Sequence, residues 1–375
     1  MKKSILFTIS LALILILSSC KTTGKPSISP AANMKTYMEH PSNSVIDYYA
    51  DVRDMNLTSF KPIPDNKMIE SLWFNNNITW PDQVSAQTAE EILSKGKNPG
   101  LGVRDLHSQG INGEGITVAI IDQNLILDHP EFKGKVIKYF DTGTKMAETE
   151  GSMHAPAVTS LLVGEEIGTA PGAKVYFAAA PSWTLDAQYQ ADALNWIIDE
   201  NEKLAAGEKI RVVSISAAPS GEGSPFTKNN DAWDEAYQRA TDAGILVLDC
   251  TSKQGLTSPC ILDLTNPEDV SKCIPGFPGQ SVTIIQDHLY IPTSHRTTAE
   301  EYNAGTPSYQ YTGVGGLSWS IPYLSGVLAM GWQLNPELSN EKIIDLVFQS
   351  AYVNNDGAKI IDPKAFIELV KTTVN

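Results

Sequence analysis

The chain has 375 residues and a formal net charge of −15 at pH 7, with 28 Lys and Arg against 43 Asp and Glu. Because nucleic acid is itself strongly negative, this balance argues against nucleic acid as a partner. The length suffices for one large α/β domain and an additional N-terminal segment.

The N-terminus has the features of an export signal. Two lysines precede an apolar run, and small residues then lead to Leu17-Ser18-Ser19-Cys20. The apolar run is short, which favours export over membrane spanning. The end of the run resembles the lipobox of bacterial lipoproteins, which implies removal of residues 1–19 and acylation of Cys20 on its sulfur and amine. Two acyl chains anchor a protein stably, so we expect an extracytoplasmic, membrane-tethered chain. An ordinary signal peptide or a membrane anchor is the alternative.

Residues 20–35 read as a lipidated tether, because the segment is rich in Lys, Ser, Thr and Pro. Lys21 follows the lipidated cysteine and is not Asp, which favours the outer membrane in a cell with two membranes. In a cell with one membrane the anchor would lie on its outer face. Residues 36–100 form either a retained N-terminal extension or a removable propeptide, and residues 101–375 form the main α/β domain.

Apolar runs and helical periodicity alternate through the main domain. Continuous apolar, β-branched runs predict strands at 116–122, 173–180, 210–216 and 244–250, with shorter extended pieces at 281–286 and 288–292. Helices are predicted at 154–164, 185–204, 230–243, 320–333 and 341–351. This alternation predicts an α/β fold with a mostly parallel central sheet and helices on both faces. The site of such a sheet lies beyond the strand C-termini.

Three side chains suit nucleophilic catalysis. Ser318 lies in GGLSWSIPYLSG, at the start of a predicted helix, where backbone N–H groups and the helix dipole favour negative charge. His154 begins another predicted helix, and Asp122 ends a buried strand. A serine nucleophile needs a histidine base and a carboxylate that orients the base. Taken singly, these residues also fit the roles of helix N-cap, core histidine and strand-end acid.

Four stretches resemble motifs of the subtilisin-like serine proteases, the subtilase or peptidase S8 family. VAIIDQNLILDHPEF resembles the aspartate motif, HAPAVTSLLVG the histidine motif, GTAPGAKVY the stretch after it, and GLSWSIPYLSG the serine motif. The resemblance runs from about residue 100 to 350. It implies a subtilisin-like fold and a monomeric serine endopeptidase that cleaves polypeptides through Asp122, His154 and Ser318.

The resemblance also assigns a substrate-binding strand. Residues Ser214, Ser216, Ala217 and Ala218 lie where family members pair with an extended substrate. Recognition there would add the substrate as a further strand, with main-chain bonds giving affinity.

The chain departs from the family pattern around each catalytic residue. Asp122 is followed by Gln-Asn, His154 by Ala-Pro-Ala, and Ser318 is flanked by Leu317 and Trp319 in place of Thr and Met. The family's oxyanion-hole asparagine is missing; its position falls on Lys253, with Gln254 beside it as an alternative donor. Loss of one such donor typically costs about 10²–10³ in rate. The alternatives are therefore a slow protease, a peptide-binding or regulatory pseudoprotease, and a purely structural lipoprotein, the last disfavoured by the triad.

The cysteines and possible metal ligands give few signals. Cys260 and Cys273 close a short loop, and an oxidising compartment permits the disulfide that we expect between them, with Cys250 free. No His/Cys spacing suggests zinc. Members of the resembled family often bind calcium, but no ligand set is legible, so we expect no cofactor.

Overall fold

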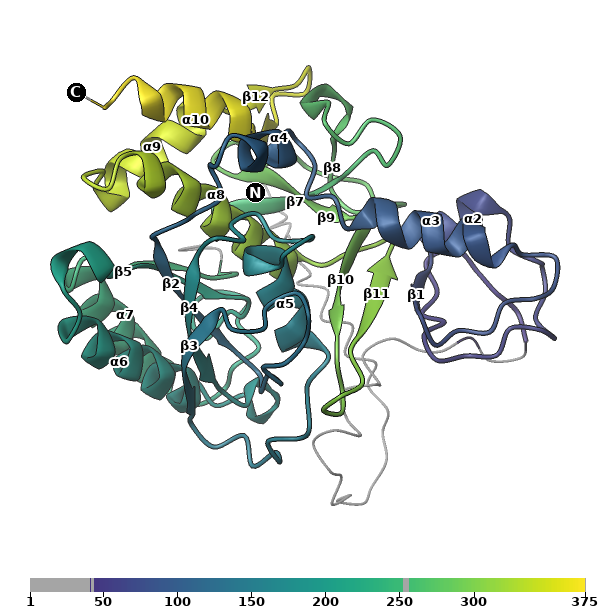
Figure 1. The fold of residues 1–375 in the computed structure, drawn as a ribbon, viewed down its shortest axis with the longest axis horizontal. Helices are drawn as coiled ribbons and strands as arrows, with labels where there is room; N and C mark the ends of the chain where they lie inside the picture. Colours follow the sequence, from purple (N-terminus) through teal and green to yellow (C-terminus); the bar gives the residue numbers. More distant parts are fainter. Residues whose placement is uncertain (1–40, 42–43, 252–255, 375) are drawn as a thin grey trace, which may run out of the picture.

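The computed structural model describes residues 41, 44–251 and 256–374. Within that part of the chain, a parallel sheet, a second five-stranded sheet and a three-stranded sheet follow one another across the molecule (Figure 1). The predicted α/β class and its parallel central sheet are confirmed. The third sheet includes part of the N-terminal segment.

The central sheet carries the predicted catalytic acid on its middle strand. Its order is β3-β4-β2-β5-β6, and every neighbouring pair is parallel. The strands are β3 (Val136–Asp141), β4 (Lys174–Ala179), β2 (Thr117–Asp122), β5 (Ile210–Ile215) and β6 (Leu246–Leu248). The predictions for β2, β4 and β5 are confirmed within a residue or two, whereas β6 is shorter than the predicted 244–250 and β3 was not predicted. Because the strands are parallel, their C-termini share one edge, where Asp122 lies.

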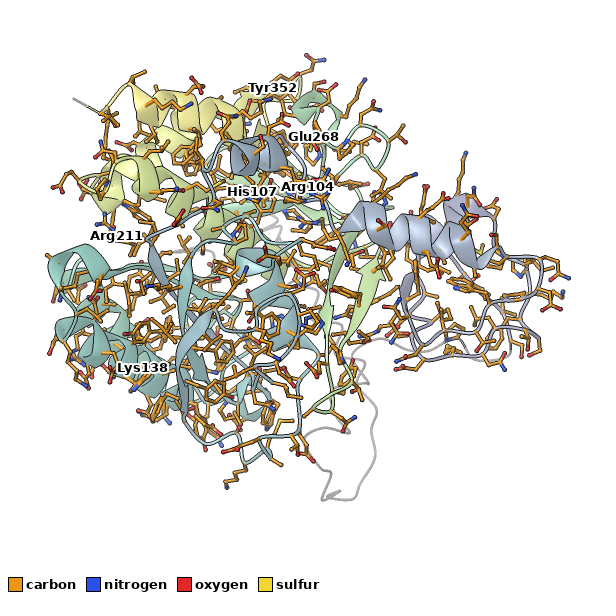
Figure 2. The ribbon with its side chains drawn as sticks, viewed as in Figure 1. Arg104, His107, Lys138, Arg211, Glu268 and Tyr352 are labelled. Carbon is orange, nitrogen blue, oxygen red and sulfur yellow. The ribbon has the colours of Figure 1, made fainter. Side chains whose placement is uncertain are left out.

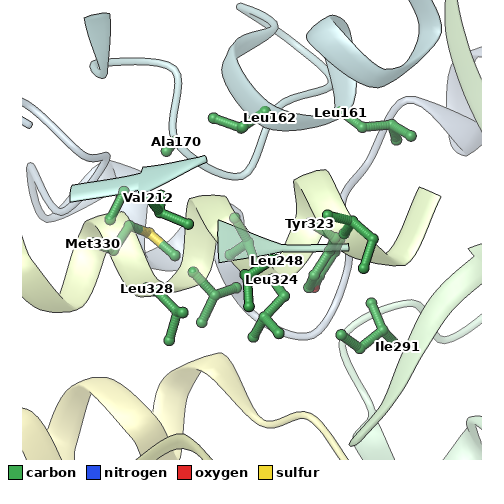
Figure 3. Packing of buried hydrophobic residues seen from close by; sticks show 14 of the residues in the cluster. Leu161, Leu162, Ala170, Val212, Leu248, Ile291, Tyr323, Leu324, Leu328 and Met330 are labelled. Carbon is green, nitrogen blue, oxygen red and sulfur yellow. The ribbon is translucent and has the colours of Figure 1, made fainter. Parts of the chain in front are cut away.

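Both faces of this sheet are buried. Val118, Ile120 and Val212 belong to a core with helices α5 (His154–Val163) and α8 (Ser320–Leu334). Alternate residues, including Ala119 and Val213, belong to a core with α6 (Gln188–Glu202) and α7 (Asn230–Asp242). Figure 3 shows Val212 and Leu248 of the sheet beside Leu324 and Leu328 of α8. The sequences of the central strands are apolar throughout because both faces of the sheet pack against helices.

The second sheet extends the fold beyond the central one. Its order is β12-β13-β9-β7-β8, and the strands are β7 (Thr257–Ile261), β8 (Ile274–Pro275), β9 (Leu289–Ser294), β12 (Tyr352–Val353) and β13 (Lys359–Ile360). Helix α8 packs against β7 and β9, and α9 (Asn340–Gln349) and α10 (Pro363–Lys371) pack around α8. The predicted piece 288–292 falls in β9. The predicted strand at 281–286 is wrong: residues 281–285 have no regular structure, and Val282 is exposed.

The N-terminal segment packs on the main domain through the third sheet. Helices α2 (Asn66–Ser71) and α3 (Ala86–Gly96) flank β1 (Trp73–Asn75), which pairs antiparallel with β11 (Ser308–Thr312). Strand β11 pairs in turn with β10 (Arg296–Glu300). In Figure 1 this segment, coloured purple to blue, lies at one end of the molecule beside β11. Helix α4 (Val103–Ser108) then leads into β2.

Several polar side chains labelled in Figure 2 join elements far apart in the sequence. Lys138 of β3 pairs with Glu200 of α6. The Arg211 guanidinium donates to the Leu338 carbonyl at 2.9 Å. Glu268 accepts the Gly102 N–H at 2.6 Å, just before α4 begins. These contacts therefore join loops and helices around the central sheet, whose two faces are packed by the apolar cores.

Candidate active site

The predicted aspartate and histidine meet at the C-terminal edge of the central sheet. His154 is the first residue of α5, and its Nδ1 lies 2.9 Å from both carboxylate oxygens of Asp122. The Gln123 N–H also donates to Asp122 Oδ1, at 2.8 Å, and helps to hold the carboxylate in place. A carboxylate at Nδ1 holds the proton there, which leaves Nε2 free to act as a base.

Burial and the neighbouring carboxylate act in opposite directions on the pKa of His154. Burial disfavours the charged imidazolium and lowers the pKa. The charge of Asp122 and its hydrogen bond favour the imidazolium, and together they outweigh burial, so the pKa lies above its usual 6.5. The carboxylate therefore stabilises the imidazolium that forms when His154 takes a proton, as a general base requires.

Ser318 lies in a single 3-10 turn, η4 (Leu317–Trp319), that leads directly into α8. The helix predicted at 320–333 is α8, and Ser318 lies in the turn just before its first residue. Gly315 before it has φ +75°, and a Cβ there would come within 1.9 Å of the Thr293 carbonyl oxygen, so only glycine fits. The turn packs against α5, β7 and β9, which brings it beside the helix that begins with His154.

Two reciprocal contacts connect Ser318 with the end of β5. Ser216 Oγ donates to the Ser318 carbonyl at 2.6 Å, and Ser318 Oγ donates to the Ser216 carbonyl at 3.4 Å. The serine hydroxyl therefore bonds to the backbone of the adjoining strand in this state, at a long distance that leaves it weakly held. Hydrogen bonds between catalytic groups often tighten only when substrate is bound.

The four predicted substrate-binding residues have different surroundings. Ser214 is inside β5, paired with Ile120 on one side and Leu248 on the other, and its side chain is buried. Its assignment to a substrate wall is therefore corrected: sheet pairing occupies its backbone. Ser216, Ala217 and Ala218 follow the strand end. Ala217 accepts the Cys250 N–H at 2.9 Å, and Ala218 accepts the Ser224 hydroxyl at 2.6 Å.

The predicted oxyanion donors Lys253 and Gln254 lie outside the described residues, so their role stays a prediction. The described start of their loop contains a buried acid that sequence reasoning did not assign. Asp249 is fully buried, and its Oδ1 accepts the N–H and hydroxyl of Thr251 at 2.9 and 2.7 Å. Burial raises the pKa of Asp249 to about 6. An acid directly after an apolar strand was the signal that could have identified it.

The residues that depart from the family pattern after Asp122 bond to the segments on either side of His154. Gln123 Nε2 donates to Ser182 Oγ at 2.9 Å, and Asn124 Nδ2 donates to the Glu150 carbonyl. Ser152 Oγ then accepts the Ala155 N–H at 3.0 Å, at the start of α5. The two amides therefore connect the end of β2 with the segments that flank the histidine. Sequence reasoning noted the departure but did not find this role.

The expected disulfide between Cys260 and Cys273 is not present: both residues are free, as is Cys250. The Cys260 and Cys273 thiols are buried and hydrogen-bonded to each other. Burial raises the pKa of the Cys260 thiol well above its usual range, and disulfide exchange requires the thiolate. Across the described residues, no three His, Cys, Asp or Glu side chains are grouped to hold a metal ion.

This arrangement defines a class of protein. The acid ends the middle strand of a parallel sheet, the histidine begins helix α5, and the serine lies in the turn just before helix α8. That chain order of aspartate, histidine and serine is the subtilisin one. The chain belongs to the subtilase family of serine peptidases: the family model described as Peptidase S8, Subtilase family, matches residues 113–365, which is more than half of the chain.

Comparisons with individual proteins agree with this assignment at low identity. A subtilisin-like protease of Coccidioides posadasii is 24% identical over 232 residues, which cover 61% of this chain and 52% of that protein. The chain therefore spans about half the length of this relative. Subtilisin E of Bacillus subtilis is 21% identical over 318 residues, with 78% of this chain and 75% of subtilisin E covered.

Two solved structures share the fold. Fervidolysin from Fervidobacterium pennivorans, a keratinolytic enzyme, superposes with a TM-score of 0.52 at 16% identity, covering 72% of this chain and 44% of its own. The prenylagaramide maturation protease PagA superposes with a TM-score of 0.51 at 17% identity, covering 72% of this chain and 98% of its own. At these identities the likeness shows the fold alone.

Proposed function

We propose that this chain is a serine endopeptidase that hydrolyses polypeptide substrates outside the cytoplasm while a lipid at Cys20 anchors it to a membrane. The observation that carries the catalytic part is the contact between Asp122 and His154, with Nδ1 at 2.9 Å from both oxygens. Membership of the subtilase family supports the reaction class. The lipobox-like residues Leu17 to Cys20 support the anchor.

The proposed chemistry assigns one role to each triad residue. Ser318 Oγ attacks the peptide carbonyl while His154 Nε2 takes its proton, and Asp122 stabilises the resulting imidazolium. The protonated His154 then donates to the leaving amine, which leaves an acyl group on Ser318. Water, deprotonated by the same histidine, releases the acid and restores the serine.

The proposed oxyanion hole takes its two donors from different segments of the chain. The backbone N–H of Ser318, just before α8, supplies one donor to the tetrahedral intermediate. The second donor is proposed to come from residues 251–254, with Lys253 or Gln254 in place of the family's asparagine. Either side chain carries N–H groups able to donate. The extended substrate is proposed to lie along Ser216–Ala218, where β5 has ended.

The membrane attachment rests on the N-terminal sequence. In the part of the chain that the structure describes, none of the helices is both long enough and apolar enough to cross a bilayer. Acylation of Cys20 would place the chain at the membrane surface through the predicted tether, residues 20–35. Replacement of Cys20 by Ser tests it: the expected result is loss of radiolabelled palmitate and release from the membrane fraction.

The missing asparagine favours a second candidate, a pseudoprotease with the same fold that binds peptides and turns over little. Reaction with a fluorophosphonate separates the two. Intact mass of the wild type should show one adduct, and the Ser318→Ala variant should show none. A folded wild-type protein that forms no adduct under conditions that label subtilisin E contradicts an activated Ser318. Peptide binding by the Ser318→Ala variant would then support the pseudoprotease.

A further inference from the structure

The N-terminal segment is built into the catalytic domain by buried contacts. The Gly313 N–H donates to the Leu72 carbonyl at 2.9 Å, and the Tyr311 hydroxyl donates to the Glu70 carbonyl at 2.8 Å. Thr297 Oγ1 donates to the Leu93 carbonyl at 2.7 Å. A Cβ on Gly313 would lie 2.3 Å from the Glu70 carbonyl oxygen, so the two backbones are in direct contact. The segment therefore shares one interior with the domain.

Strand β1 divides its side chains between two interiors. Phe74 faces the core of the N-terminal segment, where its ring lies 5.1 Å from that of Tyr311. Successive side chains of a strand point to opposite sides, so Trp73 faces the other way. Its ring meets that of Trp319 edge to face, with centroids 6.3 Å apart and planes at 82°. Trp319 is the residue after Ser318 and belongs to the same 3-10 turn.

Trp73 is itself held rigidly. Its indole N–H donates to Gln310 Oε1 at 2.8 Å, and the Arg53 guanidinium lies 4.0 Å from the ring centroid. Arg53 donates to the same Gln310 oxygen at 2.8 Å, and it forms a two-point ion pair with Asp51. Both indoles are nearly buried, with Trp73 7% and Trp319 4% exposed. Large rings with little conformational freedom transmit position well.

We propose that residues 44–100 are a retained part of the active enzyme, in which Trp73 acts as a positioning residue that sets the turn carrying Ser318 through Trp319. The inference rests on the proposed function, since it concerns the placement of the nucleophile. It accounts for a departure from the family pattern: where the family has methionine after the serine, this chain has a tryptophan, and the N-terminal segment supplies the ring that packs against it.

The proposal also distinguishes the segment from a removable inhibitor. Loss of residues 44–100 would expose Trp319, Tyr311 and the edge of β11, with its unpaired backbone groups. An inhibitor released on maturation would leave these surfaces in water. Retention keeps them covered and keeps the turn fixed.

The test uses the full processed chain and four variants. Trp73→Ala removes the contact, and Trp319→Met restores the family residue while leaving the N-terminal segment intact. The third variant combines the two. The fourth, Leu57→Ala, is a matched control, because Leu57 is fully buried in the core of the same segment. For each, kcat and KM are measured on a peptide substrate and normalised to the fraction titrated by fluorophosphonate. The intact mass of the labelled species and the melting temperature are recorded alongside.

We expect Trp73→Ala and Trp319→Met each to lower kcat about tenfold or more with KM little changed, because small displacements of a reacting group are costly. The double variant should be no slower than the slower single one. Leu57→Ala should lower the melting temperature but not kcat. The labelled species should have the mass of a chain that retains residues 44–100.

Three results would overturn the inference. These are unchanged kcat in both tryptophan variants, an equal loss of kcat in Leu57→Ala, and a labelled species that lacks residues 44–100. Should Trp73→Ala fail to fold, Trp319→Met decides, since it alters the contact from the other side. A folded wild type that takes no label refutes the proposed function, and the inference falls with it. A wild type that takes the label and gives any of the three results above refutes the inference alone.

Discussion

Asp249 should make the stability of the fold fall as the pH rises through the weakly acidic range. Its carboxyl is fully buried at the end of β6, and within the described residues Oδ2 has no hydrogen-bond partner. Burial is the largest cause of its raised pKa. The hydrogen bonds from Thr251 lower the pKa, and the charge of Asp234 raises it further. Its charge also contributes to the raised pKa values of Tyr237 and Cys250.

The size of the effect follows from the two pKa values. The pKa of Asp249 rises from 3.8 to about 6 on folding, and each unit corresponds to about 1.4 kcal/mol. A carboxyl with a raised pKa binds its proton more tightly in the folded state. Its contribution to stability is therefore greatest below pH 3.8 and is lost as the pH rises to above 6, a change of about 3 kcal/mol.

Urea unfolding at intervals from pH 4 to 7.5 would measure this change. Between pH 4 and 7, the unfolding free energy of Asp249→Asn should rise by about 2–3 kcal/mol relative to that of the wild type. The amide keeps an acceptor for Thr251, and any packing cost is independent of pH. Asp242→Asn, an exposed change on α7, should follow the wild-type profile. A difference between Asp249→Asn and wild type that stays constant across the range would refute the reasoning.

Three further predictions concern the site and the core. Asp122→Asn should lower kcat by about 10⁴. In the wild type Asp122 raises the pKa of His154 above 6.5, so the variant should also move the acid limb of the kcat/KM profile to lower pH. An acid limb that does not move in the pH–rate profile would assign it to another group. Arg296→Met should leave the melting temperature equal or higher. Arg296 is fully buried, and its Nε and Nη1 have no partner among the described residues, so its charge is costly. A clear loss of stability on thermal unfolding would show that the charge is compensated. Leu324→Ala should cost about 2–5 kcal/mol in denaturant unfolding, because the side chain fills the core between α8 and the sheet, and a cost under 1 kcal/mol would mean that the core closes around the gap.

The parts of the fold that sequence could predict are those in which burial and apolar character coincide. Strand β2 is apolar along its length because helices cover both faces, so its end at Asp122 was predictable. Strand β10 was missed for the opposite reason. It is polar in sequence, yet Arg296, Thr297 and Glu300 are all buried. Partners from distant segments satisfy several of them, among them Leu93 for Thr297 and Asn75 for Glu300, and no local pattern reports such pairing.

The site was predictable to the extent that it is encoded locally. Asp122, His154 and Ser318 each stand at the boundary of an element, and the structure brings the first two into contact. The place of Ser214 within β5 could not be read from its motif, because the point where pairing stops depends on the neighbouring strands. The contact of Trp73 with Trp319 joins residues far apart in the chain, and the sequence around either residue does not indicate the other as its partner.

The pairing of β1 with β11 also constrains when the molecule can fold. Trp73 and its partner Gln310 are 237 positions apart in the chain. The N-terminal segment therefore cannot complete its packing until almost the whole polypeptide has emerged, and contacts of such long sequence separation slow folding. Until then Trp73 and the edge of β1 stay exposed, so the interval between synthesis and β11 pairing is when this chain is most open to aggregation and to other proteases.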